Sequence, residues 1–297
     1  MFRKETYIQR RNELKTKVQK GIILFFGNSE SSMNYADNTY HFRQDSTFLY
    51  YTGLSQPDLA LTIDLETGEE VLYGDNFGID SIVWMGTQPS IAERAALAGI
   101  SKTNAFSELS QTFLMAKKQN RTIHFIPPYR GETRIQLFEL LGIHPSEIGK
   151  NASVELIKAV ASQRNYKTNE EIAEIEKAAN LTTDMHVAGM RLLKPGMNEA
   201  QIAAEVTKIA LAANGNLSFP VIATINGQTL HNHFHGNIAQ SGQLFLLDCG
   251  AETEMGYAGD MSSTFPVGAK FTSEQRVIYE IALASHQKAV SMLKPGI

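Results

Sequence analysis

An aspartate inside an otherwise apolar segment constrains this sequence more than any other feature. Asp248 follows four large apolar residues, and the segment 243–251 predicts a mostly buried strand. The segment 257–267 predicts the strand that returns beside it. If the turn between them is centred near Glu254, Asp248 and Asp260 lie six residues on either side of it and face each other. Like charges directly opposed across a ladder destabilise it, and an unpaired carboxylate in an apolar strand is costly.

A cation between the two carboxylates would remove both penalties. Directly opposed residues have Cβ atoms about 4.5–5.5 Å apart, which suits a pair of metal ions separated by about 3.5–4 Å. The alternative is that Asp248 is a hydrogen-bonded turn residue and Asp260 a polar loop residue. The apolar run before Asp248 favours the metal site, although a bulge in either strand would break the facing arrangement.

Length and composition limit the remaining classes of function. At 297 residues the chain is long enough for about two domains. Its 43% hydrophobic and 20% charged residues are typical of a soluble globular protein, and a net charge of −4 argues against nucleic acid as a partner. The sequence contains neither an apolar run long enough for a membrane span nor a secretory signal. We therefore expect a cytoplasmic protein with no membrane partner.

The single cysteine, Cys249, excludes an internal disulfide and a zinc site built from cysteines. It follows Asp248 directly, so the two side chains point to opposite faces of the predicted strand. We expect Cys249 to be a small core residue rather than a nucleophile.

The pattern along the chain predicts two domains, 1–165 and 166–297. Helical and strand patterns alternate in the first, which predicts a small α/β domain. The boundary is placed where residues 163–167 turn polar, just before a capping-box signature formed by Thr168 and Glu171. The elements expected after the boundary are helices over 170–193, 198–213 and 272–291, and strands over 220–225, 229–234 and the two segments that carry Asp248 and Asp260.

A short internal repeat links two parts of the second domain. Residues 186–197 and 286–297 share His, Leu, Lys, Pro and Gly at an offset of 100 residues. Helices that stop at Lys-Pro-Gly are common, so chance similarity is the alternative. Because the first copy introduces the unit that holds both aspartates and the second ends the chain, we expect a duplicated unit whose second half is only beginning.

A family likeness is carried by residues 42–53 (FRQDSTFLYYTG) and 84–86 in the first domain, and by Asn226-Gly227, Leu230-His231, Leu246–Gly250, Gly256–Asp260 and Ser263–Pro266 in the second. Through these residues the second domain resembles the catalytic domain of the pita-bread metallopeptidases, the group of aminopeptidase P, prolidase and methionine aminopeptidase. The first resembles the creatinase/aminopeptidase P N-terminal domain, and this pairing favours an Xaa-Pro aminopeptidase. The resemblance therefore implies a mixed α/β (α+β) fold, with a creatinase-like N-terminal domain followed by the first αβ half of a pita-bread domain.

The resemblance also implies the chemistry. In this family two Asp, one His and two Glu hold two divalent ions, with manganese favoured here and cobalt or zinc as alternatives. Asp248 matches the first Asp and Asp260 the second, which bridges both ions; a metal-bridged hydroxide then attacks the scissile bond. The implied activity is release of the N-terminal residue from peptide substrates with proline in second position, by an enzyme that forms a homo-oligomer, expected to be a dimer.

The histidine that faces the substrate in such enzymes has two candidates. His231 fits the upstream Asn-Gly anchor and the Leu-His pair, whereas His233 fits the family's His-aromatic pair. His231, His233 and His235 alternate, so they would point to one cleft if residues 229–234 form a strand. We favour His231 and keep His233 as the alternative.

Two departures from the family pattern matter. Asp248 and Asp260 are 12 residues apart, one more than usual, which predicts an extra residue in the turn. No Gly-x-Gly-His segment is present, and the acidic residues after Asp260 are Glu274 and Glu280, both on the last predicted helix. We therefore expect a truncated part of a longer enzyme that is inactive by itself and possesses no bound metal of its own.

Three other functions stay open. Prolidase cleaves Xaa-Pro dipeptides on the same fold, and its separation from an aminopeptidase needs substrate data. Creatinase-like, metal-free hydrolysis is disfavoured because both Asp ligands are present. A catalytically dead pita-bread binding or scaffold module is the alternative from another class, and substituted downstream ligands would support it.

Overall fold

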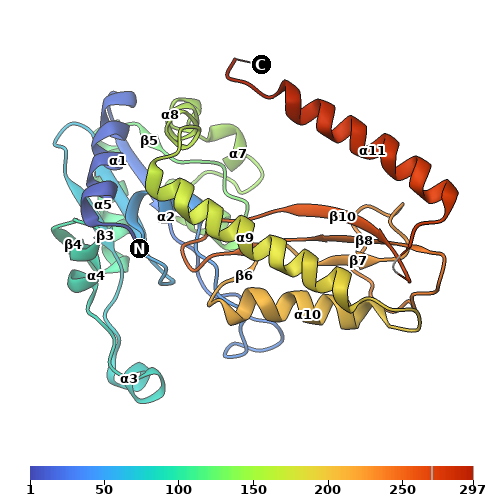
Figure 1. Ribbon diagram of the computed structural model, residues 1–297. Helices are drawn as coiled ribbons and strands as arrows, with labels where there is room; N and C mark the ends of the chain where they lie inside the picture. Colours follow the sequence, from blue (N-terminus) through green and yellow to red (C-terminus); the bar gives the residue numbers. More distant parts are fainter. Residues whose placement is uncertain (269, 297) are drawn as a thin grey trace. The chain divides into compact units, whose positions relative to one another are not determined.

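The computed structural model describes residues 1–268 and 270–296 and divides into two compact units, Met1–Lys167 and Thr168–Ile297 (Figure 1). The division follows Lys167, two residues after the end of the predicted first domain. None of the helices in the described ranges has both the length and the apolar character needed to cross a membrane.

The first unit is built on a five-stranded sheet in the order β4-β3-β2-β1-β5. The β1–β2 and β2–β3 pairs are antiparallel, whereas β1–β5 and β3–β4 are parallel. Its strands are β1 (Ile22–Phe26), β2 (Ala60–Asp64), β3 (Glu70–Tyr73), β4 (Lys102–Asn104) and β5 (Ile123–His124). Its helices are α1 (Lys4–Lys17), α2 (Ser46–Thr52), α3 (Ile79–Met85), α4 (Ile91–Leu97), α5 (Leu109–Lys118), α6 (Gly131–Leu141), α7 (Ile148–Asn151) and α8 (Val154–Arg164), with a 3₁₀ turn at Phe106–Glu108.

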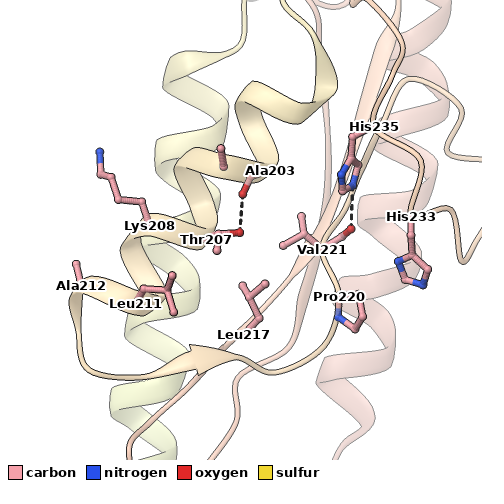
Figure 2. A pocket seen from close by; sticks show the side chains of 11 residues that line it. Ala203, Thr207, Lys208, Leu211, Ala212, Leu217, Pro220, Val221, His233 and His235 are labelled. Atoms are coloured by element: carbon pink, nitrogen blue, oxygen red, sulfur yellow. Dashed lines mark hydrogen bonds between the residues drawn. The ribbon is translucent and has the colours of Figure 1, made fainter. Parts of the chain in front are cut away.

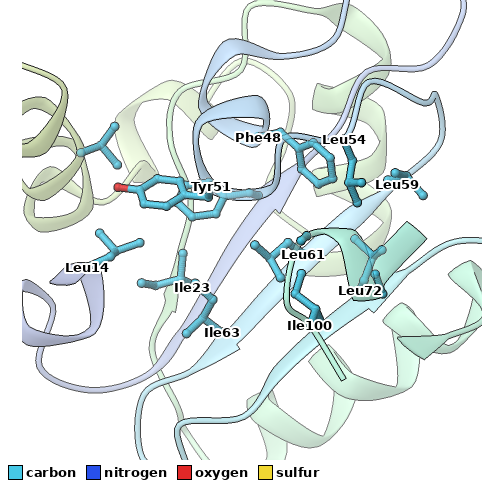
Figure 3. Close-up of a cluster of buried hydrophobic side chains, with 14 of the residues drawn as sticks. Leu14, Ile23, Phe48, Tyr51, Leu54, Leu59, Leu61, Ile63, Leu72 and Ile100 are labelled. Carbon is cyan, nitrogen blue, oxygen red and sulfur yellow. The ribbon is translucent and has the colours of Figure 1, made fainter. Parts of the chain in front are cut away.

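Both faces of this sheet are covered by helices. Successive strand residues point to opposite faces, so neighbouring residues of β1 belong to different hydrophobic clusters. Ile23 and Phe25 of β1 belong to one cluster with Phe48 and Tyr51 of α2. Figure 3 shows Ile23, Phe48 and Tyr51 in this cluster. Ile22 and Leu24 belong to a second cluster with residues of α5, α6 and α7. Burial on both sides explains why β1 is an uninterrupted apolar run in the sequence.

The second unit contains a three-stranded antiparallel sheet in the order β10-β8-β7 and a two-stranded pair, β6 and β9. Phe245, Leu247 and Cys249 of β8 are fully buried against residues of α9 and α10. The strands are β6 (Asn216–Leu217), β7 (Ile222–Thr224), β8 (Leu244–Cys249), β9 (Ala251–Glu252) and β10 (Met261–Pro266), and the helices are α9 (Asn169–Leu192), α10 (Glu199–Ala212) and α11 (Ser273–Met292).

A glycine sets the distance between α9 and the sheet. A Cβ atom at Gly189 would lie 2.8 Å from Leu247 Cδ2 and would clash with it. Glycine in the middle of a helix is intrinsically unfavourable, and this close approach is the physical reason for it at this position.

The repeat is also a repeat of backbone conformation over its described residues. Helix α9 ends at Leu192 and α11 at Met292, and the residues that follow have similar dihedral angles: φ −57° and ψ 124° at Leu193, and φ −67° and ψ 118° at Leu293. Gly196 and Gly296 have φ of +89° and +87°. Ile297, the last residue of the second copy, lies outside the described residues. The two helix ends are thus built alike, but α9 buries seven residues and α11 buries none among those described.

The capping boxes at the starts of α9 and α11 allow a matched test of whether each helix contributes to the stability of the folded core. Thr168 accepts from the Glu171 N–H at the start of α9, and Thr272 accepts from the Gln275 N–H at the start of α11. Because α9 is part of the core, Thr168→Ala should lower the free energy of unfolding by about 1 kcal/mol. Thr272→Ala should leave it unchanged within about 0.5 kcal/mol, because α11 can fray locally. Urea unfolding followed by circular dichroism measures both, and equal losses would show that α11 is coupled to the core.

Candidate functional site

The prediction that Asp248 and Asp260 face each other directly is wrong. Asp248 pairs with Ser262, and Cys249 pairs with Met261. The turn is centred on Met255, one residue later than predicted: the Thr253 N–H donates to the Tyr257 carbonyl (2.9 Å) and the Gly256 N–H to the Thr253 carbonyl (2.8 Å). Gly256 has φ of +78°, a conformation that favours glycine. The position of this glycine therefore fixes the register.

The two aspartates nevertheless belong to the same face of the ladder. Asp260 immediately precedes β10 and lies two residues from Ser262, the partner of Asp248. Side chains two residues apart on extended backbone point the same way, so Asp248 and Asp260 are diagonal neighbours. Diagonal positions across an antiparallel pair are about 7–8 Å apart. Asp260 is exposed and Asp248 is half-buried.

Asp248 has an unsatisfied buried oxygen. Its Oδ1 atom is inaccessible to solvent and has no hydrogen-bond partner in the structure. A buried carboxylate oxygen without a donor is costly, and a divalent cation is one group that would satisfy it. Asp248 and Asp260 therefore fit a cation that prefers oxygen ligands. In the described ranges, no group of three or more His, Cys, Asp and Glu residues is placed to hold a metal ion.

Cys249 is buried in the core, on the strand face opposite Asp248. Burial raises the pKa of its thiol to about 12, and the negative charges of Asp248 and Asp260 contribute to the rise. The thiol is therefore protonated at neutral pH and is not an activated nucleophile.

His186 of α9 connects the two strands that carry the site, a role the sequence did not reveal. Its Nδ1 lies 2.6 Å from Ser263 Oγ on β10, and its Nε2 lies 3.3 Å from the Cys249 carbonyl oxygen on β8. A carbonyl only accepts, so Nε2 donates and Nδ1 accepts from the Ser263 hydroxyl. The internal repeat, in which this histidine is the first shared residue, was the one sequence signal that singled it out.

The prediction that residues 229–234 form a strand is wrong, and so is the alternation of three histidines on one strand face. This segment is a turn followed by irregular chain. The Thr229 N–H donates to the Asn226 carbonyl (3.0 Å), and Asn232 Oδ1 accepts from the Phe234 N–H (3.0 Å). Asparagine side chains compete with strand pairing through such local hydrogen bonds.

The histidine candidates have different surroundings in this segment. His231 is exposed, and no hydrogen bond of its side chain occurs among the described contacts. His233 and His235 line a mostly apolar groove of about 920 Å³ along α10, and His235 Nε2 lies 3.0 Å from the Val221 carbonyl oxygen (Figure 2). Among the described residues, no hydrogen bond or ion pair joins His231 or His233 to Asp248 or Asp260.

Glu199, the first residue of α10, anchors both ends of the segment 225–237, which carries the three histidines and is called the histidine loop below. The sequence did not predict this role. Glu199 is fully buried. Its Oε1 accepts from Thr224 Oγ1 and the Ile225 N–H (both 2.9 Å), and its Oε2 accepts from Asn237 Nδ2 (2.9 Å) and the Asn237 N–H (3.2 Å). An acidic residue in the first helical turn normally indicates only favourable helix electrostatics, so this contact was not visible in the sequence.

Comparison with known proteins matches both units. Residues 173–297 match the model of metallopeptidase family M24, and residues 7–124 match the model of the aminopeptidase P, N-terminal domain. The chain is 27% identical to the Xaa-Pro aminopeptidase of Escherichia coli, an alignment that covers 99% of this chain and 69% of that protein. It is 29% identical to a probable Xaa-Pro aminopeptidase of Chaetomium globosum, over 93% of this chain and 46% of that protein.

Solved structures confirm the fold prediction. Proline aminopeptidase P II from Yersinia pestis superposes with a TM-score of 0.85 at 27% identity, over 99% of this chain and 70% of that chain. Zn-substituted E. coli aminopeptidase P in complex with product gives a TM-score of 0.83 at 27% identity, over 99% and 69%. The fold is therefore the creatinase-like N-terminal domain followed by part of a pita-bread domain. The chain spans between 46% and 70% of the lengths of these four relatives.

Removal of the Glu199 carboxylate should destabilise the second unit strongly. Glu199→Ala leaves several buried donors without an acceptor, so it should lower the free energy of unfolding by about 3 kcal/mol or more. Glu205→Ala is the matched control, because Glu205 lies on the same helix and pairs with the exposed Lys208; it should change stability by less than about 0.5 kcal/mol. Urea unfolding measures both, and similar values for the two variants would contradict the anchoring role.

Proposed function

We propose that this chain carries part of the centre of a metal-dependent Xaa-Pro aminopeptidase, because residues 173–297 match the model of metallopeptidase family M24 and residues 7–124 match that of the aminopeptidase P N-terminal domain. Its reaction is the release of the N-terminal residue from peptides with proline in second position. The observation that carries the proposal is the unsatisfied buried oxygen of Asp248, on the same ladder face as Asp260.

We propose the following roles for the residues of the site. Asp248 and Asp260 would supply carboxylate oxygens to divalent ions, and such ions would activate water and polarise the scissile carbonyl. His186 holds β8 and β10 together behind them through Cys249 and Ser263. His231, with His233 as the alternative, stays the candidate that faces the substrate, and the Glu199 anchor positions the loop that carries both.

We propose that the 297-residue chain is inactive by itself. Two aspartates are the metal-type ligands that its described residues bring to one face, and two carboxylates alone should bind a divalent ion weakly. The further ligands of a complete centre would come from outside residues 1–297. The relatives it matches are longer, with the chain covering 69% of the E. coli enzyme.

Three further properties stay predictions: manganese as the preferred ion, a cytoplasmic location and a dimeric state. Support for self-association comes from α3, whose Ile79, Val83 and Trp84 are 81%, 74% and 88% exposed. Large apolar side chains gathered at a surface mark interaction sites.

A titration with Mn²⁺ tests the metal site, with the free ion followed by electron paramagnetic resonance. The unmodified chain should bind weakly, and Asp248→Asn and Asp260→Asn should each weaken binding at least about tenfold, because each removes a charged ligand. Glu254→Gln, an equal change of charge at the exposed tip of the same hairpin, is the control and should bind like the unmodified chain. Equal binding by all four proteins would remove both aspartates as ligands.

Hydrolysis of Xaa-Pro substrates tests the reaction. We expect the chain with Mn²⁺ to release no amino acid from either an Xaa-Pro dipeptide or a longer Xaa-Pro peptide. Efficient cleavage of the longer peptide would disprove inactivity and support the aminopeptidase. Cleavage restricted to the dipeptide would instead assign the chain to the prolidase reaction.

A further inference from the structure

The first unit contains a cavity of its own, separate from the groove along α10. It lies at the edge of the sheet where strands β1 and β5 end. The two strands are parallel, so their carboxyl ends meet at the same edge. In open α/β sheets this edge is the usual place for ligands. The cavity has a volume of about 440 Å³ and lies between Asn28 after β1, Arg130 after β5, Arg164 at the end of α8 and the segment that leads into α2.

Positive charge dominates the lining of this cavity. Arg43, Arg130 and Arg164 all line it, and Asp45 is the acidic residue among its described lining residues. The Asp45 carboxylate already caps α2, because its Oδ1 accepts from the Thr47 and Phe48 N–H groups (both 2.8 Å). Three guanidinium groups therefore share one cavity of a protein whose net charge is −4.

Two of these arginines, Arg130 and Arg164, each use one N–H group in a hydrogen bond within the protein. Arg130 donates one hydrogen bond to the Ser29 carbonyl (2.6 Å), and Arg164 donates one to Thr47 Oγ1 (3.3 Å). A guanidinium carries five N–H donors. Neither group forms a salt bridge among the described residues, although the nearby Asp45 carboxylate attracts Arg164 electrostatically. Such groups recognise carboxylates and phosphates through paired, charge-assisted hydrogen bonds.

Two other lining residues suit a carbon skeleton. Ile126 and Tyr129 line the cavity, and the Tyr129 hydroxyl accepts a hydrogen bond from Asn28 Nδ2 (3.0 Å). Asn28 is itself buried, 5% exposed, and also donates to the Arg43 carbonyl (2.8 Å). The aromatic ring is thus anchored by the sheet edge. The volume lies within the range of about 300–1,000 Å³ that small-molecule sites occupy.

We propose that this cavity binds a small organic anion. Its carboxylate or phosphate group is held by Arg130, Arg164 and Arg43, and its apolar part lies against Ile126 and Tyr129. The site uses residues of the first unit alone and needs no metal, so it stands independently of the proposed peptidase activity.

Calorimetric titration with four probes tests the site without metal. Benzoate and phenyl phosphate carry the anionic groups, and benzamide and phenol are their neutral counterparts. Benzoate, phenyl phosphate or both should bind at least about tenfold more tightly than the neutral counterpart and more weakly at high salt. Which anion binds more tightly identifies a carboxylate or a phosphate as the natural group. Equal affinities for the charged and neutral probes would overturn the proposal.

Substitutions then locate the binding. Arg164→Gln and Arg130→Gln should each weaken binding of the preferred anion at least about tenfold. Arg164 is exposed, so its replacement should leave the fold intact, which the far-ultraviolet circular dichroism spectrum checks. Arg3→Gln, at an exposed position of the same unit, is the control and should bind like the unmodified chain. Unchanged affinity in both cavity variants would place the anion elsewhere and refute the site.

Discussion

The pairing of β8 with β10 is the constraint on which the candidate metal centre depends. It places Asp248 inside the ladder opposite Ser262 and leaves Asp260 one residue before the strand begins. The turn at Gly256 sets this register, and His186 supports it from α9 by contacts to both strands. A carboxylate held in this way can keep an unsatisfied oxygen, because the surrounding core resists the rearrangement that would expose it.

Much of the second unit could be predicted because its signals are local. The capping boxes of Thr168 and Thr272 start α9 and α11 where the sequence indicates, and the apolar run before Asp248 forms a strand. The register failed because a turn centre displaced by one residue changes the partner of Asp248 from Asp260 to Ser262. Strand side chains alternate with a period of two, so this error moved the partner by two positions and kept both aspartates on one face.

The histidine loop and Glu199 show what a local pattern cannot reveal. Alternating histidines resemble a strand, yet asparagine side chains and a turn occupy the hydrogen bonds that a ladder would need. Glu199 contacts Asn237, 38 residues away, and nothing in the first turn of a helix indicates such a partner. The repeat makes the same point, because helix ends 100 residues apart are alike in conformation although His186 is buried and His286 is exposed.

The burial of Cys249 has a practical consequence for work on this protein. It is the one cysteine in the sequence, and its thiol is fully enclosed and protonated at neutral pH. Thiol-directed dyes and spin labels react with the thiolate, so the native chain offers them almost no background. A pair of cysteines introduced at chosen surface positions would then carry the labels selectively, which makes distances within each unit accessible to fluorescence and electron spin measurements without first removing a native residue.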